Sequence, residues 1–200
     1  MLKEYSKLAS QKNIQNTIEA LKENGIEAEF VEIGADAKRR VFELLPEGAD
    51  IMTQTSVTLS TLGIADEING SSKYNPARAK FKDQSQREKQ KSGAAPEWTI
   101  GSVHAVTMDG SVLIASNTGS QLPSYVYGAD HVIWVVGAQK IVANVDEGIK
   151  RIHEYVLPLE DARAQKAYGM GSNVSKLLII NKEVKPGRIH LIFVNEVLGF

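Results

Sequence analysis

The sequence contains no cysteine among its 200 residues. This absence excludes disulfide bonds, zinc or iron–sulfur sites ligated by thiolates of this chain, and a thiol nucleophile. Long apolar runs are also missing, because no segment approaches the roughly 18 consecutive apolar residues that a membrane-spanning helix needs. The first ten residues are charged and carry no signal-peptide core. We therefore expect a cytoplasmic protein that does not contact a membrane.

The sequence also lacks an excess of charge of either sign. Its formal net charge is −1, so the chain as a whole does not attract nucleic acid. Apolar residues make up 42% of the chain, which is sufficient for a substantial core. The length fits one domain spanning residues 1–200.

Residues 71–96 differ in composition from the rest of the chain. They carry seven basic and two acidic residues and no large aliphatic side chain. Such a segment forms an exposed helix, a mobile lid or a partly disordered loop. A lid would place Arg78 or Arg87 over an anionic ligand. Nucleic-acid binding is disfavoured, because no aromatic residues alternate with the basic ones in a base-stacking pattern.

Apolar spacing and turn residues predict alternating helices and strands. Helices are predicted over residues 3–24, 36–45, 145–155 and 158–168, with a further helix capped by Thr55 or Ser56 and ending at residue 62. Strands are predicted over residues 26–33, 50–54, 101–107, 111–116, 131–136, 140–143, 176–180 and 188–194. The turn residues Asp109 and Gly110 join two of these strands as a hairpin. This order of elements is typical of an α/β fold.

A small polar loop follows the strand at 111–116. A buried strand that ends in such a loop is a common way for α/β proteins to build a ligand pocket. Backbone N–H groups of the loop, and a helix opening at residues 121–122, would favour an anion. The predicted ligand-binding residues of this loop are Asn117, Thr118, Gly119, Ser120 and Gln121. The alternative is a capped turn that binds nothing.

Two further groups are candidates for the same ligand. Thr55, Ser56 and Thr58 form a second polar cluster between a strand and a helix, where simple helix capping is the alternative. Lys140 follows the strand at 131–136 and would pair with a carboxylate or phosphate, unless it is a surface lysine. The sequence leaves open whether the loops near 55 and 117 meet in space.

Other chemistries lack a signal. The histidines at 104, 131, 153 and 190 have no i, i+4 spacing, so no metal site is predicted. Neither a glycine-rich dinucleotide motif nor a serine-hydrolase motif occurs. Asp66 and Glu67 are predicted to lie in a solvated acidic loop.

Three segments carry a family resemblance. The runs GSVHAVTMDGSVLIASNTGSQLP, GADHVIWVVGAQKIV and PLEDARAQKAYG resemble the LUD (lactate-utilisation) domain family, as does the earlier run TQTSVTLSTLGI. The resemblance implies a Rossmann-like three-layer α/β sandwich with a largely parallel sheet, similar to the ribose-5-phosphate isomerase and CoA-transferase group. It also implies a link to lactate oxidation beside iron–sulfur partner proteins, whose clusters this cysteine-free chain cannot ligate itself.

The expected function is therefore the binding of a small anionic metabolite in lactate or related hydroxy-acid utilisation. One alternative is an isomerase-like or CoA-transferase-like enzyme, for which Glu67, Glu160 and Asp130 are the carboxylates to locate. The other is a non-catalytic subunit that docks on an iron–sulfur oxidoreductase. Redox chemistry would need a cofactor or partner, because these side chains alone do not carry it. The sequence identifies no cofactor, and it leaves open both catalysis and homo-oligomer formation.

Overall fold

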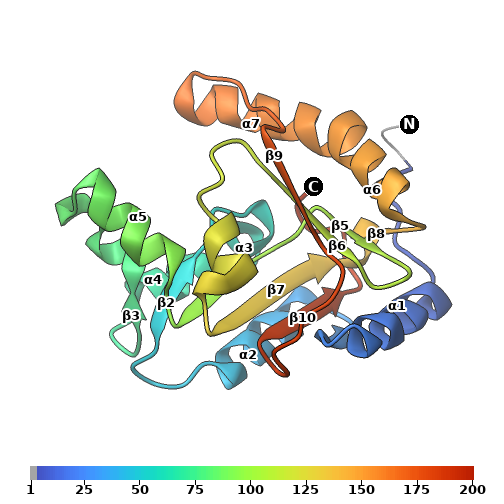
Figure 1. Cartoon of the computed structure of the whole chain (residues 1–200), viewed down its shortest axis with the longest axis horizontal. Coiled ribbons are helices and arrows are strands. Elements are labelled where there is room, and N and C mark those ends of the chain that lie inside the picture. The colour runs from blue at the N-terminus through green and yellow to red at the C-terminus, as the bar shows by residue number, and fades with distance from the viewer. Residues whose placement is uncertain (1–3) are drawn as a thin grey trace.

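A parallel sheet of six strands forms the centre of the computed structural model, which describes residues 4–200 (Figure 1). All its neighbouring strands run parallel, which confirms the predicted fold class. In spatial order the strands are β1 (Glu27–Val31), β10 (Ile189–Val194), β7 (His131–Gly137), β4 (Trp98–Gly101), β2 (Asp50–Thr53) and β3 (Asn75–Pro76).

Helices flank this sheet and connect its strands. They are α1 (Gln11–Glu23), α2 (Gly34–Leu44), α3 (Val57–Thr61), α4 (Ile64–Gly70), α5 (Gln86–Ala94), α6 (Val145–Arg151) and α7 (Leu157–Tyr168). Within residues 4–200, no helix is both long and apolar enough to cross a membrane.

Strand β7 shows how the sheet is buried on both faces. Ile133 and Val135 join one apolar cluster with residues of α2, α3 and α4. Val132, Trp134 and Val136 point the other way and join a second cluster with α1 and a smaller sheet. Side chains alternate between the two faces of a strand, so a strand covered on both faces is apolar throughout.

The smaller sheet has four strands, in the order β8 (Ile141–Val142), β5 (Ala105–Thr107), β6 (Val112–Ser116) and β9 (Lys176–Ile180). The prediction of one strand over 101–107 is wrong, because β4 ends in the parallel sheet and residues 102–104 carry the chain across to β5. The hairpin turn is confirmed, since β5 and β6 pair antiparallel and Gly110 has a φ of +84°. Residues 102–104 therefore lie between the two sheets.

The first helix also differs from its prediction. It begins at Gln11, after the side chain of Ser10 accepts a hydrogen bond from the backbone N–H of Asn13, so residues 4–10 lie outside it. Residue 3, which the prediction included, lies outside the described residues.

The two helices predicted at 145–155 and 158–168 form one unbroken helical rod, residues 145–168, in which a π-helical turn, Ile152–Val156, joins α6 to α7. The rod covers the outer side of the smaller sheet (Figure 1). Asp66 and Glu67 do not lie in a loop, because both belong to α4. Placing acidic side chains in the first turn of a helix is favourable, since they face its positive end.

The basic segment 71–96 is largely helical. It contains a 3-10 helix, Ala77–Asp83, followed by α5. A capping box of Ser85 and Glu88 begins α5. The first of these helices brings Arg78 back to the end of β2.

Replacing Ser56 with alanine should cost about 1 kcal/mol of stability. The Ser56 hydroxyl accepts a hydrogen bond of 3.3 Å from the backbone N–H of Leu59, so Ser56 rather than Thr55 caps α3. Urea unfolding measures the loss. Ser60→Ala, an exposed change in the same helix, is the control, and an equal loss in both variants would contradict the capping role.

Candidate functional site

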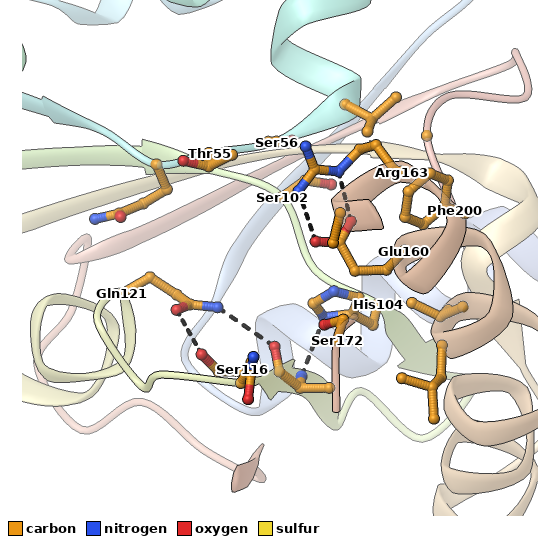
Figure 2. Close-up of a pocket in the computed structure, with 18 of the residues that line it drawn as sticks. Thr55, Ser56, Ser102, His104, Ser116, Gln121, Glu160, Arg163, Ser172 and Phe200 are labelled. Atoms are coloured by element: carbon orange, nitrogen blue, oxygen red, sulfur yellow. Dashed lines mark hydrogen bonds and ion pairs between the residues drawn. The ribbon is translucent and has the colours of Figure 1, made fainter. Parts of the chain in front are cut away.

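A cavity of about 590 Å³ lies where several strands of the parallel sheet end. Residues that follow the carboxyl ends of β2, β4, β7 and β10 all line it. In Figure 2, Thr55 and Ser56 lie on one side, Ser116 and Gln121 on another, and Glu160, Arg163 and Phe200 opposite them. Crevices at the carboxyl ends of parallel strands are where α/β proteins hold their ligands.

The two predicted polar loops meet in this cavity. Residues 55, 56 and 58 line it together with residues 117, 118, 120 and 121, whereas Gly119 is not part of the lining. The loops are more than 50 residues apart in sequence, and the crossing between the two sheets brings them together. The sequence left open whether these loops meet, and their meeting is the condition that a single site requires.

The donors of loop 116–121 are largely used within the protein. The N–H of Gly119 donates to Ser116 Oγ at 2.8 Å, and the N–H of Ser120 donates to Thr118 Oγ1 at 3.3 Å. Asn117 does not adopt a positive φ, which in the described residues occurs only at glycines such as Gly119. These two hydrogen bonds hold the shape of the loop and occupy the N–H groups of Gly119 and Ser120.

The cluster at 55–58 is similarly engaged. Thr55 Oγ1 accepts a 2.8 Å hydrogen bond from Arg78 Nη2. Thr58 Oγ1 donates to the carbonyl oxygen of Leu198 at 3.2 Å. The two hydroxyls therefore fix the positions of groups from distant segments. Thr55 holds the Arg78 guanidinium, and Thr58 holds the carbonyl group of Leu198.

Lys140 is buried in the cavity wall rather than on the surface, with only 2% of its area exposed. Its Nζ lies 3.0 Å from Val103 O, 3.1 Å from Ser102 Oγ and 3.4 Å from Thr58 Oγ1. None of the described carboxylates pairs with it. Burial lowers the pKa of Lys140 well below its usual range, and the nearby Arg151 guanidinium lowers it further.

His104 lines the same cavity as Lys140. Its Nδ1 accepts a 3.1 Å hydrogen bond from the backbone N–H of Ala115, so the neutral ring carries its proton on Nε2 (Figure 2). Burial lowers the pKa of His104 to about 3, and the nearby basic groups of Lys140 and Arg151 lower it further. The imidazole is therefore neutral at pH 7, and it adds an uncharged N–H donor to the wall of the cavity.

Arg151 is the buried charge behind these two residues. Its Nη1 donates to the carbonyl oxygen of His104, and its guanidinium lies 5.1 Å from the ring centroid of Tyr155. Nε and Nη2 have no hydrogen-bond partner among the described residues. Burial lowers its pKa to about 10, so it remains a cation at pH 7.

Arg78 brings a further positive charge to the cavity. It donates from Nε to Thr53 O and from Nη2 to Thr55 Oγ1, which fixes the guanidinium at the end of β2. Burial lowers the pKa of Arg78. No described carboxylate forms an ion pair with it.

Among the described residues that line the cavity, Glu160 alone has an acidic side chain. Both of its oxygens accept 2.7 Å hydrogen bonds from Arg163, through Nε and Nη2 (Figure 2). This bidentate pair raises the pKa of Arg163. Two other carboxylates that the sequence singled out lie elsewhere, because Glu67 pairs with Lys38 and Asp130 pairs with Lys185.

The cavity is therefore electropositive. Arg78 and Lys140 lack an acidic partner, whereas the charges of Glu160 and Arg163 offset each other. The described residues contain no group of three or more histidine, cysteine, aspartate or glutamate side chains that could hold a metal ion. Such a cavity is suited to a carboxylate or phosphate ligand.

Several lining residues escaped sequence reasoning. Ser102 and His104 belonged to a predicted strand, and Arg163 lay in the run PLEDARAQKAYG, which served only for the family resemblance. The available signal was Gly101, where the strand stops and the chain turns. Arg78 was recognised only as one option within the basic segment, and Arg87 does not line the cavity.

The comparisons with known proteins address family and fold. The family model of the LUD domain matches residues 14–194. The fold is similar to that of a DUF162 family protein from Deinococcus radiodurans, with a TM-score of 0.59 and 13% sequence identity, covering 94% of this chain and 100% of that chain. None of the curated proteins matches the sequence. Because the family model spans most of the sequence, this chain belongs to the LUD domain family.

Proposed function

We propose that the protein binds a small anionic metabolite in its cavity and takes part in the utilisation of lactate or a related hydroxy acid. The observation that carries the proposal is the Arg78 guanidinium, a cation that faces the cavity without an acidic partner, with the buried amine of Lys140 in the same lining. A buried positive charge is costly unless an anion or strong hydrogen bonds compensate it, so a bound carboxylate would relieve that cost. Family membership supports the link to lactate.

The surrounding donors suit a hydroxy acid. Arg78 is held by Thr53 O and Thr55 Oγ1, and this support presents the rest of its planar guanidinium to a carboxylate. The neutral His104 and the hydroxyl of Ser102 line the same cavity and would contact a hydroxyl or carbonyl oxygen without adding charge. The cavity of about 590 Å³ has room for more than a three-carbon acid, so a cofactor or larger substrate would fit beside it.

The isomerase-like or CoA-transferase-like alternative has less support. It needs a free carboxylate as a base or nucleophile, and Glu160 is the only one of the three candidates that lines the cavity. Arg163 occupies both of its oxygens. An enzyme of that kind would have to break this pair before Glu160 could react.

Thermal unfolding with lactate, pyruvate, sugar phosphates, CoA, and flavin and nicotinamide nucleotides tests the proposal. A ligand present at 100 times its dissociation constant should stabilise the fold by about 2.7 kcal/mol. Stabilisation by lactate or another small carboxylate is the expected result. No stabilisation by any of these compounds would reject metabolite binding and favour the subunit that docks on an iron–sulfur oxidoreductase.

Arg78→Gln should weaken the binding of that carboxylate about 10- to 100-fold, because a hydrogen bond to a charged group contributes about 1.5–3 kcal/mol. Calorimetric titration measures the change. Arg87→Gln is the matched control, since it removes the same charge from the same basic segment at an exposed position outside the cavity lining. Equal weakening in both variants would mean that net charge, rather than a contact of Arg78, attracts the ligand.

A further inference from the structure

The three hydrogen bonds of Lys140 define how its amine is oriented. Val103 O is a carbonyl oxygen and only accepts. Thr58 gives its hydroxyl proton to Leu198 O, so towards Lys140 its oxygen also accepts. Ser102 Oγ, 3.1 Å from Nζ, has no other hydrogen-bond partner among the described residues, and its hydroxyl is therefore free either to accept or to donate.

A neutral amine fits these partners. All three oxygens can accept from Nζ; a neutral amine donates its two N–H groups to two of them, Ser102 Oγ among these, and keeps one lone pair for a bound ligand. The surroundings favour the neutral form, because burial and the Arg151 cation both lower the pKa of Lys140 and no described carboxylate opposes them. Desolvation and a neighbouring cation are the two conditions that turn a lysine into a nucleophile.

We propose that Lys140 is a carbonyl-reactive amine that forms an imine with a small 2-oxo acid held in the cavity. This inference deepens the proposed function and rests on it, because the bound carboxylate is what would hold the carbonyl carbon near Nζ. A 2-oxo acid is the oxidised counterpart of a 2-hydroxy acid and offers the same carboxylate to Arg78. The hydroxy acid has no carbonyl group, so it binds without reacting.

The covalent step needs no further reactant. The Nζ lone pair attacks the carbonyl carbon, and an amine proton passes through the Ser102 hydroxyl to the carbonyl oxygen, which gives a carbinolamine. The carbon–oxygen bond then breaks, the hydroxyl leaves as water with the second amine proton, and a carbon–nitrogen double bond forms. One amine and one ketone thus yield one imine and one water, with no change of oxidation state.

Reductive trapping tests this proposal on the unmodified protein. Pyruvate and sodium cyanoborohydride are added at pH 7, and the modified lysines are located by peptide mass spectrometry. Lys140 should be labelled more than about tenfold faster than an exposed lysine, since each unit of lowered pKa raises the neutral fraction of an amine about tenfold. Lys176, which lies beside loop 116–121 and donates to Asn117 O at 3.2 Å, is the internal comparison.

The outcomes separate this inference from the proposed function. Labelling of Lys140 that lactate suppresses by competition would support both. Stabilisation by pyruvate without labelling of Lys140, or labelling spread equally over exposed lysines, would overturn the imine and leave anion binding intact. Neither stabilisation nor labelling would reject both.

Two variants complete the test. Ser102→Ala removes the proposed proton relay and should slow labelling at least about tenfold. Proton transfer by a positioned side chain typically contributes about 10²–10⁴-fold. The variant should change pyruvate affinity much less, and an unchanged labelling rate would exclude the relay. Lys140→Arg keeps a long basic side chain but cannot form the imine, so any label that persists in its peptide would count against the assignment.

Discussion

Replacing Gly101 with alanine is expected to lower the free energy of unfolding by up to about 3 kcal/mol, the usual range for overpacking a core. Gly101 is buried at the end of β4, and an added Cβ would lie 1.8 Å from the hydroxyl oxygen of Tyr125 and 3.3 Å from Cβ of Gln54. Tyr125 cannot easily move away, because its ring packs edge-on against Trp134 with the centroids 5.4 Å apart. Urea unfolding measures the loss.

The matched control for this change is Gly70→Ala, where an added Cβ meets nothing within 4 Å. A second comparison introduces Gly101→Ala into a Tyr125→Phe background. Removing the hydroxyl should recover part of the lost stability, and a double-mutant cycle isolates that coupling. The same loss in both backgrounds would show that the Tyr125 hydroxyl is not the obstacle.

Acidification is expected to destabilise the protein through His104. The pKa of this imidazole is about 3 in the folded protein and 6.5 in the unfolded chain, so the unfolded chain binds a proton first as the pH falls. The stability contributed by neutral His104 is complete above pH 6.5 and is lost progressively between pH 6.5 and 3. Between pH 6.5 and 5 the expected loss is about 2 kcal/mol.

The contribution of His104 is obtained by subtracting the pH dependence of a His104→Asn variant from that of the native protein. Asparagine offers an oxygen acceptor to the N–H of Ala115 but does not titrate. Lys140 and Arg151 are the basic groups that face the imidazole, and both are retained in this comparison. His153→Asn, which removes an exposed imidazole from the rod, is the matched control. If the free energy of unfolding of the native protein and of the His104→Asn variant changed in parallel with pH, the conclusion that His104 is buried and neutral would be contradicted.

Periodicity predicted most elements of the parallel sheet. The apolar run at 131–136 became β7, and the alternating segment near residue 30 became β1. The stretch 101–107 was misjudged because β4 and β5 are both short and apolar, and no local residue pattern separates two strands of different sheets from one longer strand. The break at residues 102–104 depends on which sheet each half pairs with.

The residues of the candidate site were predicted only in part, because a local pattern shows the type of a residue but not its distant neighbours. The polar residues at 55–58 and 116–121 were identified as possible ligand contacts from their types and from the strands before them. That their hydroxyls and N–H groups are mostly engaged within the protein followed only from the fold. Lys140 looked equally suited to the surface, and its burial against Ser102 and Val103 required the second sheet.

The sequence by itself predicted most of the helices and strands and the hairpin at Gly110, because periodicity and turn geometry are contained in short stretches of chain. The family and the largely parallel sheet were implied by the resemblance of whole sequence runs to a known family. The tertiary structure decided that Arg78, His104 and Lys140 share one cavity, and that Arg163 rather than a ligand engages Glu160. Their protonation depends on burial and on charges from distant segments, which exist only once the chain has folded.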